Sequence, residues 1–203
     1  MQNRDARNTM PVEVLSRRTI MDDFFVIEEV YLRHGRFDGG MTGKLRRLRL
    51  IRGDAAACLP YDPRRKRFFL VEQFRWPPYS IGEPGWLLEI PAGLLSPGEA
   101  PEVCMARELE EETGMRAEKL TPLLTFFSTP GGSTERIFLF TAEVEGSGAE
   151  GRLAGAPEEN EDIKVRSFTY EEAFKMVWEG RIRDGKTILA ILAFKDRILK
   201  GNL

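Results

Sequence analysis

The chain has 203 residues, enough for one well-packed domain or for one domain with a small appended module. Its composition, 42% hydrophobic and 31% charged, is ordinary for a globular protein. A formal net charge of -2 gives no reason to expect a broad cationic surface for nucleic acid or anionic membrane. A negatively charged substrate would therefore need a local cation, such as a metal ion or a few arginines.

The amino-terminal part of the chain predicts β-structure. Two apolar, arginine-rich stretches at residues 23–33 and 41–52 flank the turn-forming sequence Phe37-Asp38-Gly39-Gly40, which predicts an antiparallel hairpin. Beyond it we expect strands at residues 53–59, 67–75 and 86–90, with a loop rich in proline and glycine at residues 77–85.

Residues 101–113 are predicted to form the first helix. Pro101 suits the first turn, where its missing N–H donor costs nothing, and Gly114 suits a left-handed stop. Strands at residues 120–127 and 136–144 follow.

Strands and helices alternate again in the last third of the chain. A loop rich in Gly, Ala and Glu at residues 146–160 is too long for a plain connection. Thr169 with Glu172 predicts a capping box at the start of a helix. The expected elements are a strand at residues 163–168, a helix over 169–180 and a helix over 187–200. This interleaving predicts an α/β or α+β fold in which helices pack on a mixed sheet.

Four glutamates crowd the end of the predicted helix over residues 101–113. The partial negative charge at a helix C-terminus disfavours acidic residues there, and Glu108 and Glu112 repel one another across one turn. Arg107 can relieve only part of this repulsion. The cluster is either a solvated acidic face or a site for a hard cation such as Mg²⁺, which takes a few carboxylates and leaves its other positions to water and phosphate.

The spacing around this cluster favours the cation site. A strand predicted to be buried leads through a loop into the helix, and the fixed residues of that loop and helix are Gly93, Glu99, Arg107-Glu108-Leu109, Glu111-Glu112 and Gly114-Met115. These are the fixed positions of the Nudix box, so the chain resembles the Nudix hydrolase superfamily.

The resemblance implies an α/β/α sandwich around a mixed sheet and an enzyme that hydrolyses a nucleoside diphosphate linked to another group. The implied metal ligands are Glu108, Glu112 and the carbonyl of Ala92, with Glu111 as a further or alternating catalytic ligand. Arg107 and Glu99 would orient the helix and loop, a supporting role in catalysis. Mg²⁺ is the expected ion, with Mn²⁺ as an alternative.

Segments outside the box resemble the bacterial ADP-ribose pyrophosphatase family. They are Glu72-Gln73-Phe74-Arg75, Trp86-Leu87-Leu88-Glu89, Ser128-Thr129-Pro130-Gly131-Gly132 and Glu158-Glu159-Asn160-Glu161-Asp162-Ile163. The family has Ser-Pro-Gly-Gly where this chain has Thr-Pro-Gly-Gly. The resemblance runs from about Phe24 to the last helix. It implies a hairpin subdomain over residues 1–52, exchanged between the subunits of a homodimer, ahead of a hydrolase domain over residues 53–203.

The same resemblance implies roles for residues outside the box. Glu159 matches the catalytic base, Glu161 a carboxylate that reaches a metal when substrate is bound, and Arg75 a contact to the diphosphate or terminal ribose. The residues matched around the adenine are Phe24, Phe25 and Arg47, and further substrate contacts are Arg52, Leu94, Gly131 and Glu135. Without the family match, the acidic loop could be plainly solvated, Arg75 a surface arginine and the two phenylalanines hairpin core.

The implied reaction is the hydrolysis of ADP-ribose to AMP and ribose 5-phosphate. The alternative is a GDP-mannose or other nucleotide-sugar pyrophosphatase, whose family resembles this chain also at Glu179-Gly180-Arg181-Ile182-Arg183-Asp184-Gly185-Lys186-Thr187. A regulatory nucleotide sensor would show a degraded box or an added DNA-binding helix pair, and neither is present in the sequence.

Several other sequence features exclude competing sites. His34 is the only histidine, which argues against a histidine triad or a histidine-rich zinc site. Asp184-Gly185-Lys186-Thr187 lacks P-loop spacing and predicts a helix start. Cys58 and Cys104 lie in apolar stretches typical of reduced core residues. No signal peptide or transmembrane-length apolar run occurs, so we expect a cytoplasmic protein that binds neither nucleic acid nor membrane.

Overall fold

The computed structural model describes residues 10–155 and 162–197. They divide into two compact units. The smaller unit comprises the described residues up to Gly53 together with Thr129–Glu135, and the larger comprises Asp54–Ser128 together with the described residues from Arg136 onward.

The smaller unit contains a three-stranded antiparallel sheet in the order β1-β2-β3. Its strands are β1 (Val12–Asp22), β2 (Val26–His34) and β3 (Leu45–Ile51). The predicted hairpin is present as β2 and β3, and β1 is an additional strand that the sequence did not predict. Glu29 on the central strand ties the sheet together, because it pairs with Arg18 of β1 at 2.8 Å and with Arg46 of β3 at 2.6 Å. Arg46 and Arg18 hold the pKa of Glu29 below its ordinary value.

The larger unit is built on a mixed sheet in the order β10-β11-β5-β4-β9-β8, with β6 paired to β5 and β7 paired to β4. The pair β4–β9 is parallel and the other pairs are antiparallel. The strands are β4 (Ala55–Asp62), β5 (Arg67–Phe74), β6 (Trp86–Glu89), β7 (Ala92–Leu94), β8 (Ala117–Phe127), β9 (Arg136–Val144), β10 (Leu153–Ala154) and β11 (Ile163–Thr169).

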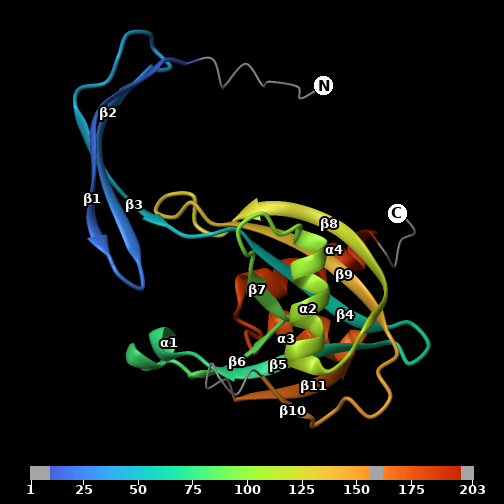
Figure 1. Cartoon of the computed structure of the whole chain (residues 1–203). Coiled ribbons are helices and arrows are strands. Elements are labelled where there is room, and N and C mark those ends of the chain that lie inside the picture. The colour runs from blue at the N-terminus through green and yellow to red at the C-terminus, as the bar shows by residue number, and fades with distance from the viewer. Residues whose placement is uncertain (1–9, 156–161, 198–203) are drawn as a thin grey trace. The chain divides into compact units, whose positions relative to one another are not determined.

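Helices cover both faces of this sheet, as Figure 1 shows. Helix α2 (Pro101–Thr113) covers one face, and α3 (Tyr170–Trp178) and α4 (Gly185–Arg197) cover the other. The short helix α1 (Trp76–Ser80) follows β5 and buries no residue. Side chains alternate along β4, so Ala57 and Leu59 enter the core under α3 and α4 whereas Ala56 and Cys58 enter the core under α2. Cys58 and Cys104 are free and buried. The larger unit is therefore the α/β/α sandwich with a mixed sheet that the sequence predicted.

Local signals set the ends of the helices. Helix α2 has its predicted bounds, and Gly114 ends it at φ 68° with its N–H donating to the Glu110 carbonyl at 2.7 Å. The Thr169–Glu172 capping box opens α3 as predicted.

Several expected boundaries differ in the structure. Strand β4 runs to Asp62 rather than to residue 59, and strand β8 begins at Ala117 rather than at residue 120. The loop expected at residues 77–85 begins with the short helix α1, which tolerates two prolines because both stand in its first turn. Strand β10 lies within the long loop expected at residues 146–160. Helix α4 begins at Gly185, two residues earlier than expected. Among the described residues, no helix is long and apolar enough to cross a membrane.

Candidate functional site

The side chains of two glutamates on helix α2, Glu108 and Glu112, lie against the backbone of strand β7, which precedes this helix in the chain. The backbone N–H of Ala92 donates to the carboxylate of Glu112 at 3.2 Å. Gly93 approaches Glu108 so closely that an added Cβ would overlap the Glu108 carboxyl group. On the neighbouring strand β4, Gly93 pairs with Ala56, whose methyl group enters the core under α2. The box glycine is therefore a packing requirement of the Glu108 side chain.

Replacing Gly93 by alanine is expected to lower the free energy of unfolding by about 1–3 kcal/mol, the usual cost of overpacking a fitted site. Because the new methyl group must displace Glu108, activity should fall as well. Urea unfolding followed by circular dichroism measures the first effect. Gly43→Ala is the control, since nothing lies within 4 Å of a Cβ built there. Equal stability of the two variants would contradict this account of Gly93.

Arg107 organises the acidic end of α2. It donates to Glu108 at 2.7 Å and to Glu111 at 3.0 Å, and its Nε lies 3.5 Å from the Glu99 carboxylate. Glu99 in turn accepts a hydrogen bond from the backbone N–H of Ser96 at 2.9 Å. Burial lowers the pKa of Arg107, but the Glu108 and Glu99 carboxylates outweigh it and raise the pKa above its ordinary value. One guanidinium thus connects three carboxylates of the box.

The donor chemistry of this cluster fits a hard divalent cation. Glu108, Glu111 and Glu112 offer carboxylate oxygens and Ala92 a backbone carbonyl, the ligands that Mg²⁺ and Mn²⁺ favour. Glu112 is buried and Glu108 nearly so, and desolvated carboxylates gain from a cation. Within residues 10–155 and 162–197, no three His, Cys, Asp or Glu side chains are gathered as they would be around a bound metal.

A second cluster of charges surrounds Arg75, at the end of β5. Its Nε donates to Glu89 Oε1 at 2.8 Å and one Nη to Glu89 Oε2 at 3.2 Å. Lys186 of α4 donates to Glu89 Oε2 at 2.5 Å and lies 3.1 Å from Asp184. Burial alone would raise the pKa of Glu89, but Lys186 and Arg75 hold it below its ordinary value. Burial lowers the pKa of Arg75, but Glu89 outweighs it, with smaller contributions from Glu112 and Asp184, and the pKa lies above its ordinary value.

Glu89→Gln is expected to lower the free energy of unfolding at pH 7 by about 3 kcal/mol, the low end for breaking a buried ion pair, because Arg75 is half exposed. The folded-state pKa of Glu89 lies below the unfolded value of about 4.3. The stability that ionised Glu89 contributes is therefore fully present above its unfolded-state pKa, and it is lost as the pH falls through the folded-state pKa. Denaturant unfolding of both proteins from pH 7 to pH 3 should show their stabilities converging in acid. A difference that does not change with pH would contradict the assignment.

The structure places six of the predicted substrate residues in the smaller unit. Three of them gather where the Thr-Pro-Gly-Gly turn meets the end of β3. There Arg52 pairs with Glu135 at 2.8 Å, and the Gly132 carbonyl next to Gly131 accepts from the Leu50 N–H at 2.7 Å. The other residues of this group are Phe24, Phe25 and Arg47.

Phe24 and Phe25 lie in the turn between β1 and β2, with their rings edge-on at 4.7 Å. Phe24 is 83% exposed, so the alternative of hairpin core is wrong for it. Arg47 is exposed on β3. Leu94, in the larger unit, is half exposed on β7.

The predicted acidic loop is described only in part. Glu159 and Glu161 lie outside the described residues. The N–H of Gly155 donates to the Glu111 carbonyl at 3.4 Å, and the N–H of Gly151 to the Val165 carbonyl at 2.8 Å. The described start of this loop is therefore attached to the last turn of α2 and to β11.

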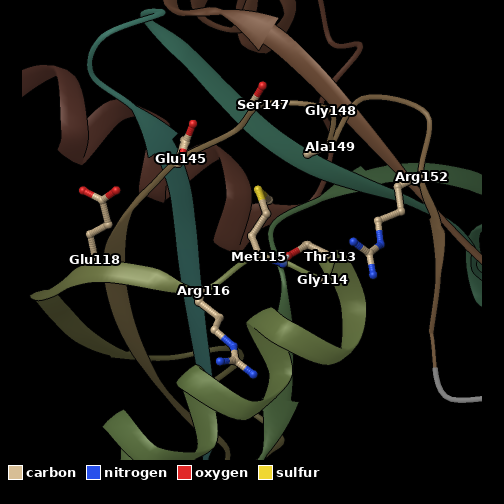
Figure 2. Close-up of a pocket in the computed structure, with 10 residues that line it drawn as sticks. All are labelled: Thr113, Gly114, Met115, Arg116, Glu118, Glu145, Ser147, Gly148, Ala149 and Arg152. Carbon is tan, nitrogen blue, oxygen red and sulfur yellow. Dashed lines mark hydrogen bonds between the residues drawn. The ribbon is translucent and has the colours of Figure 1, made fainter.

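A cavity of about 260 Å³ lies beyond the C-terminal end of α2 (Figure 2). The Arg152 side chain extends towards Gly114, where a Cβ would overlap its guanidinium. A cation at this end of a helix is favoured by the helix dipole. Arg116 and Arg152 are balanced by Glu118 and Glu145, and none of the ten lining residues was predicted as a site residue. The cavity is thus separate from the acidic cluster and has no excess of positive charge.

Sequence reasoning missed the partners of Arg75. Glu89 stands in a segment that resembles the ADP-ribose pyrophosphatase family, and Lys186 in a predicted helix start and a segment that resembles the GDP-mannose pyrophosphatase family, but neither was predicted as a site residue. One signal was available: a lysine in the first turn of a helix is opposed by the helix dipole, so it needs an acidic partner.

The chain is similar to proteins of one known family. The NUDIX domain model matches residues 51–190. The ADP-ribose pyrophosphatase of Haemophilus influenzae is 40% identical over 184 residues, which is 89% of this chain and 84% of that protein. An Escherichia coli protein of the same name is 38% identical over 180 residues, 89% of this chain and 86% of that one.

A further relative and a solved structure of the same fold extend the comparison. The GDP-mannose pyrophosphatase of Pectobacterium atrosepticum is 36% identical over 192 residues, 94% of this chain and 96% of that protein. The crystal structure of an ADP compounds hydrolase superposes with a TM-score of 0.72 at 21% identity and covers 94% of this chain and 95% of the other. The box spacing, the sandwich fold and these relatives show that the chain belongs to the NUDIX family.

Proposed function

We propose that the protein hydrolyses the diphosphate of ADP-ribose, giving AMP and ribose 5-phosphate, in a reaction that depends on Mg²⁺ or Mn²⁺. The observation that carries the proposal is the intact box, whose Glu108 and Glu112 side chains meet the backbone of β7. Relatives named ADP-ribose pyrophosphatase at 38–40% identity support the choice of substrate.

The reaction adds one water molecule. A P–O bond forms to the water oxygen, the bridging P–O bond of the diphosphate breaks, and the protons of water are shared between the base and the products. Glu108, Glu112, Glu111 and the Ala92 carbonyl would hold the divalent ion. When bound, this ion neutralises the diphosphate and makes its phosphorus more electrophilic.

The chain's own residues perform the other tasks. Arg107 fixes the orientation of Glu108 and Glu111 through its two hydrogen bonds. The half-exposed guanidinium of Arg75 binds the diphosphate or the terminal ribose. Glu159 accepts the proton of the attacking water, and Glu161 supplies a further carboxylate once substrate is present.

Seven further residues outside the acidic cluster are proposed to contact the substrate, and three of them are assigned to the adenine. Phe24, Phe25 and Arg47 would surround the adenine, with Phe24 exposed and available for stacking. The remaining contacts are Arg52, Leu94, Gly131 and Glu135.

We propose further that two chains form a homodimer through residues 1–52. Strand β1 is exposed along its whole length, and its exposed apolar side chains are Val12, Val14, Leu15, Ile20 and Met21. An apolar surface of this kind is typical of a protein interface. Light scattering coupled to size exclusion should give twice the 23.1 kDa of one chain. We place the dimer in the cytoplasm, in keeping with two free, buried cysteines.

GDP-mannose is the second candidate substrate, because relatives named GDP-mannose pyrophosphatase at 35–36% identity span at least 90% of this chain. The test is a comparison of kcat/KM for ADP-ribose, GDP-mannose and other nucleotide sugars, with AMP or GMP release measured by chromatography. We expect ADP-ribose to have the highest value. A preference for GDP-mannose would replace the substrate, and release from none of them would reject the function.

A further inference from the structure

Lys186 occupies an unusual place for a lysine. It lies in the first turn of α4, where the helix dipole disfavours a cation, and its side chain is only 14% exposed. Burial lowers the pKa of Lys186, but Glu89 and Asp184 outweigh it and raise the pKa above its ordinary value. The lysine is therefore held as a cation by two specific carboxylates.

Glu89 joins Lys186 to Arg75. Its Oε1 accepts from Arg75 Nε at 2.8 Å, and its Oε2 accepts from both Arg75, at 3.2 Å, and Lys186, at 2.5 Å. Donors on both oxygens fix the plane of the carboxylate. Because the guanidinium follows that plane, the position of Lys186 sets the orientation of Arg75.

The charges of this cluster balance only when Lys186 is present. Arg75 and Lys186 supply two positive charges, and Glu89 and Asp184 supply two negative ones. Without Lys186 the cluster would carry an excess negative charge close to Arg75, which Glu112 already influences. A diphosphate approaching Arg75 would then be repelled.

Thr187, the residue after Lys186, fixes the start of α4 to the backbone that follows strand β6. Its hydroxyl donates to Asp184 at 2.5 Å and accepts from the backbone N–H of Ile90 at 2.8 Å. Ile90 follows Glu89 and stands two residues before Ala92. The start of α4 thus holds both the Glu89 side chain and the backbone that leads into the glutamate site.

We propose that Lys186 is a positioning residue for substrate binding, which acts through Glu89 to orient Arg75 and to keep its charge available for the diphosphate. This inference rests on the proposed function, since it takes Arg75 as a substrate contact.

The test is a double-mutant cycle on the full-length protein with ADP-ribose and Mg²⁺. Lys186→Met is expected to raise KM about 10-fold or more, as loss of a supporting contact usually does, with a smaller change in kcat. In an Arg75→Gln background the same change should alter KM far less, because the group it positions is gone. Lys175→Met, an exposed lysine on α3, is the matched control and should leave both constants unchanged.

An equal KM increase in both backgrounds would overturn the inference, as would a fall in kcat with KM unchanged. If Lys186→Met does not fold, Lys186→Gln, which keeps a donor to Glu89 without the charge, is put through the same cycle. If the wild-type protein hydrolyses no nucleotide sugar, the proposed function fails on its own account. Positioning is then judged from the crystal structure of the variant, where an Arg75–Glu89 contact still at 2.8 Å would refute it and a displaced guanidinium would support it.

Discussion

Replacing Glu112 by glutamine is expected to lower kcat for ADP-ribose by roughly 10³-fold, because a divalent ion contributes several kcal/mol to stabilising the charge of the transition state. Glutamine keeps an oxygen that can accept the Ala92 N–H, so the fold should survive. Steady-state kinetics and thermal unfolding of the variant measure the two effects separately.

Glu110→Gln is the matched control for this prediction. Glu110 stands on the same helix but pairs with the exposed Arg116 on the surface, and such pairs contribute little. Its activity should equal that of the wild-type protein. Near-normal turnover of Glu112→Gln, or an equal loss in both variants, would contradict the assignment of Glu112 as a metal ligand.

Glu159→Gln is expected to lower kcat by about 10²- to 10⁴-fold, the range for loss of a general base, with a much smaller change in KM. The reason is that a base acts on water in the transition state and makes no contact that holds the substrate. Raising the pH should not restore the rate, because glutamine cannot accept the proton.

Glu158→Gln provides the comparison, since it removes the adjacent charge from the same segment. It should retain most of the activity. An unchanged rate in Glu159→Gln would reject this residue as the base, and an equal loss in both variants would show that the charge of the segment matters rather than one carboxylate.

The parts of the fold that sequence predicted are those set by local signals. Helix α2 was predicted at both ends because Pro101 and Gly114 act on their own turns. The capping box of α3 is equally local. Strand β1 was missed because every residue in it is exposed, so its polar and apolar residues gave no alternation between a buried and a solvated face.

The candidate site likewise contains residues that local sequence spacing predicts and contacts that only the folded chain makes. Glu108, Glu111 and Glu112 could be predicted because box spacing places them on one helix. The Glu89–Lys186 pair joins residues 97 positions apart, and no local pattern reports such a contact. It forms only when α4 packs beside β6, so the supporting partners of Arg75 had to come from the fold.

The most direct test of the central claim is AMP release from ADP-ribose by the purified protein, followed by chromatography with Mg²⁺ and again with excess chelator. We predict that AMP and ribose 5-phosphate appear in equal amounts with Mg²⁺, that release stops with chelator, and that added Mg²⁺ restores it. ADP-ribose that stays intact in Mg²⁺, or release that continues at the same rate in chelator, would contradict the account.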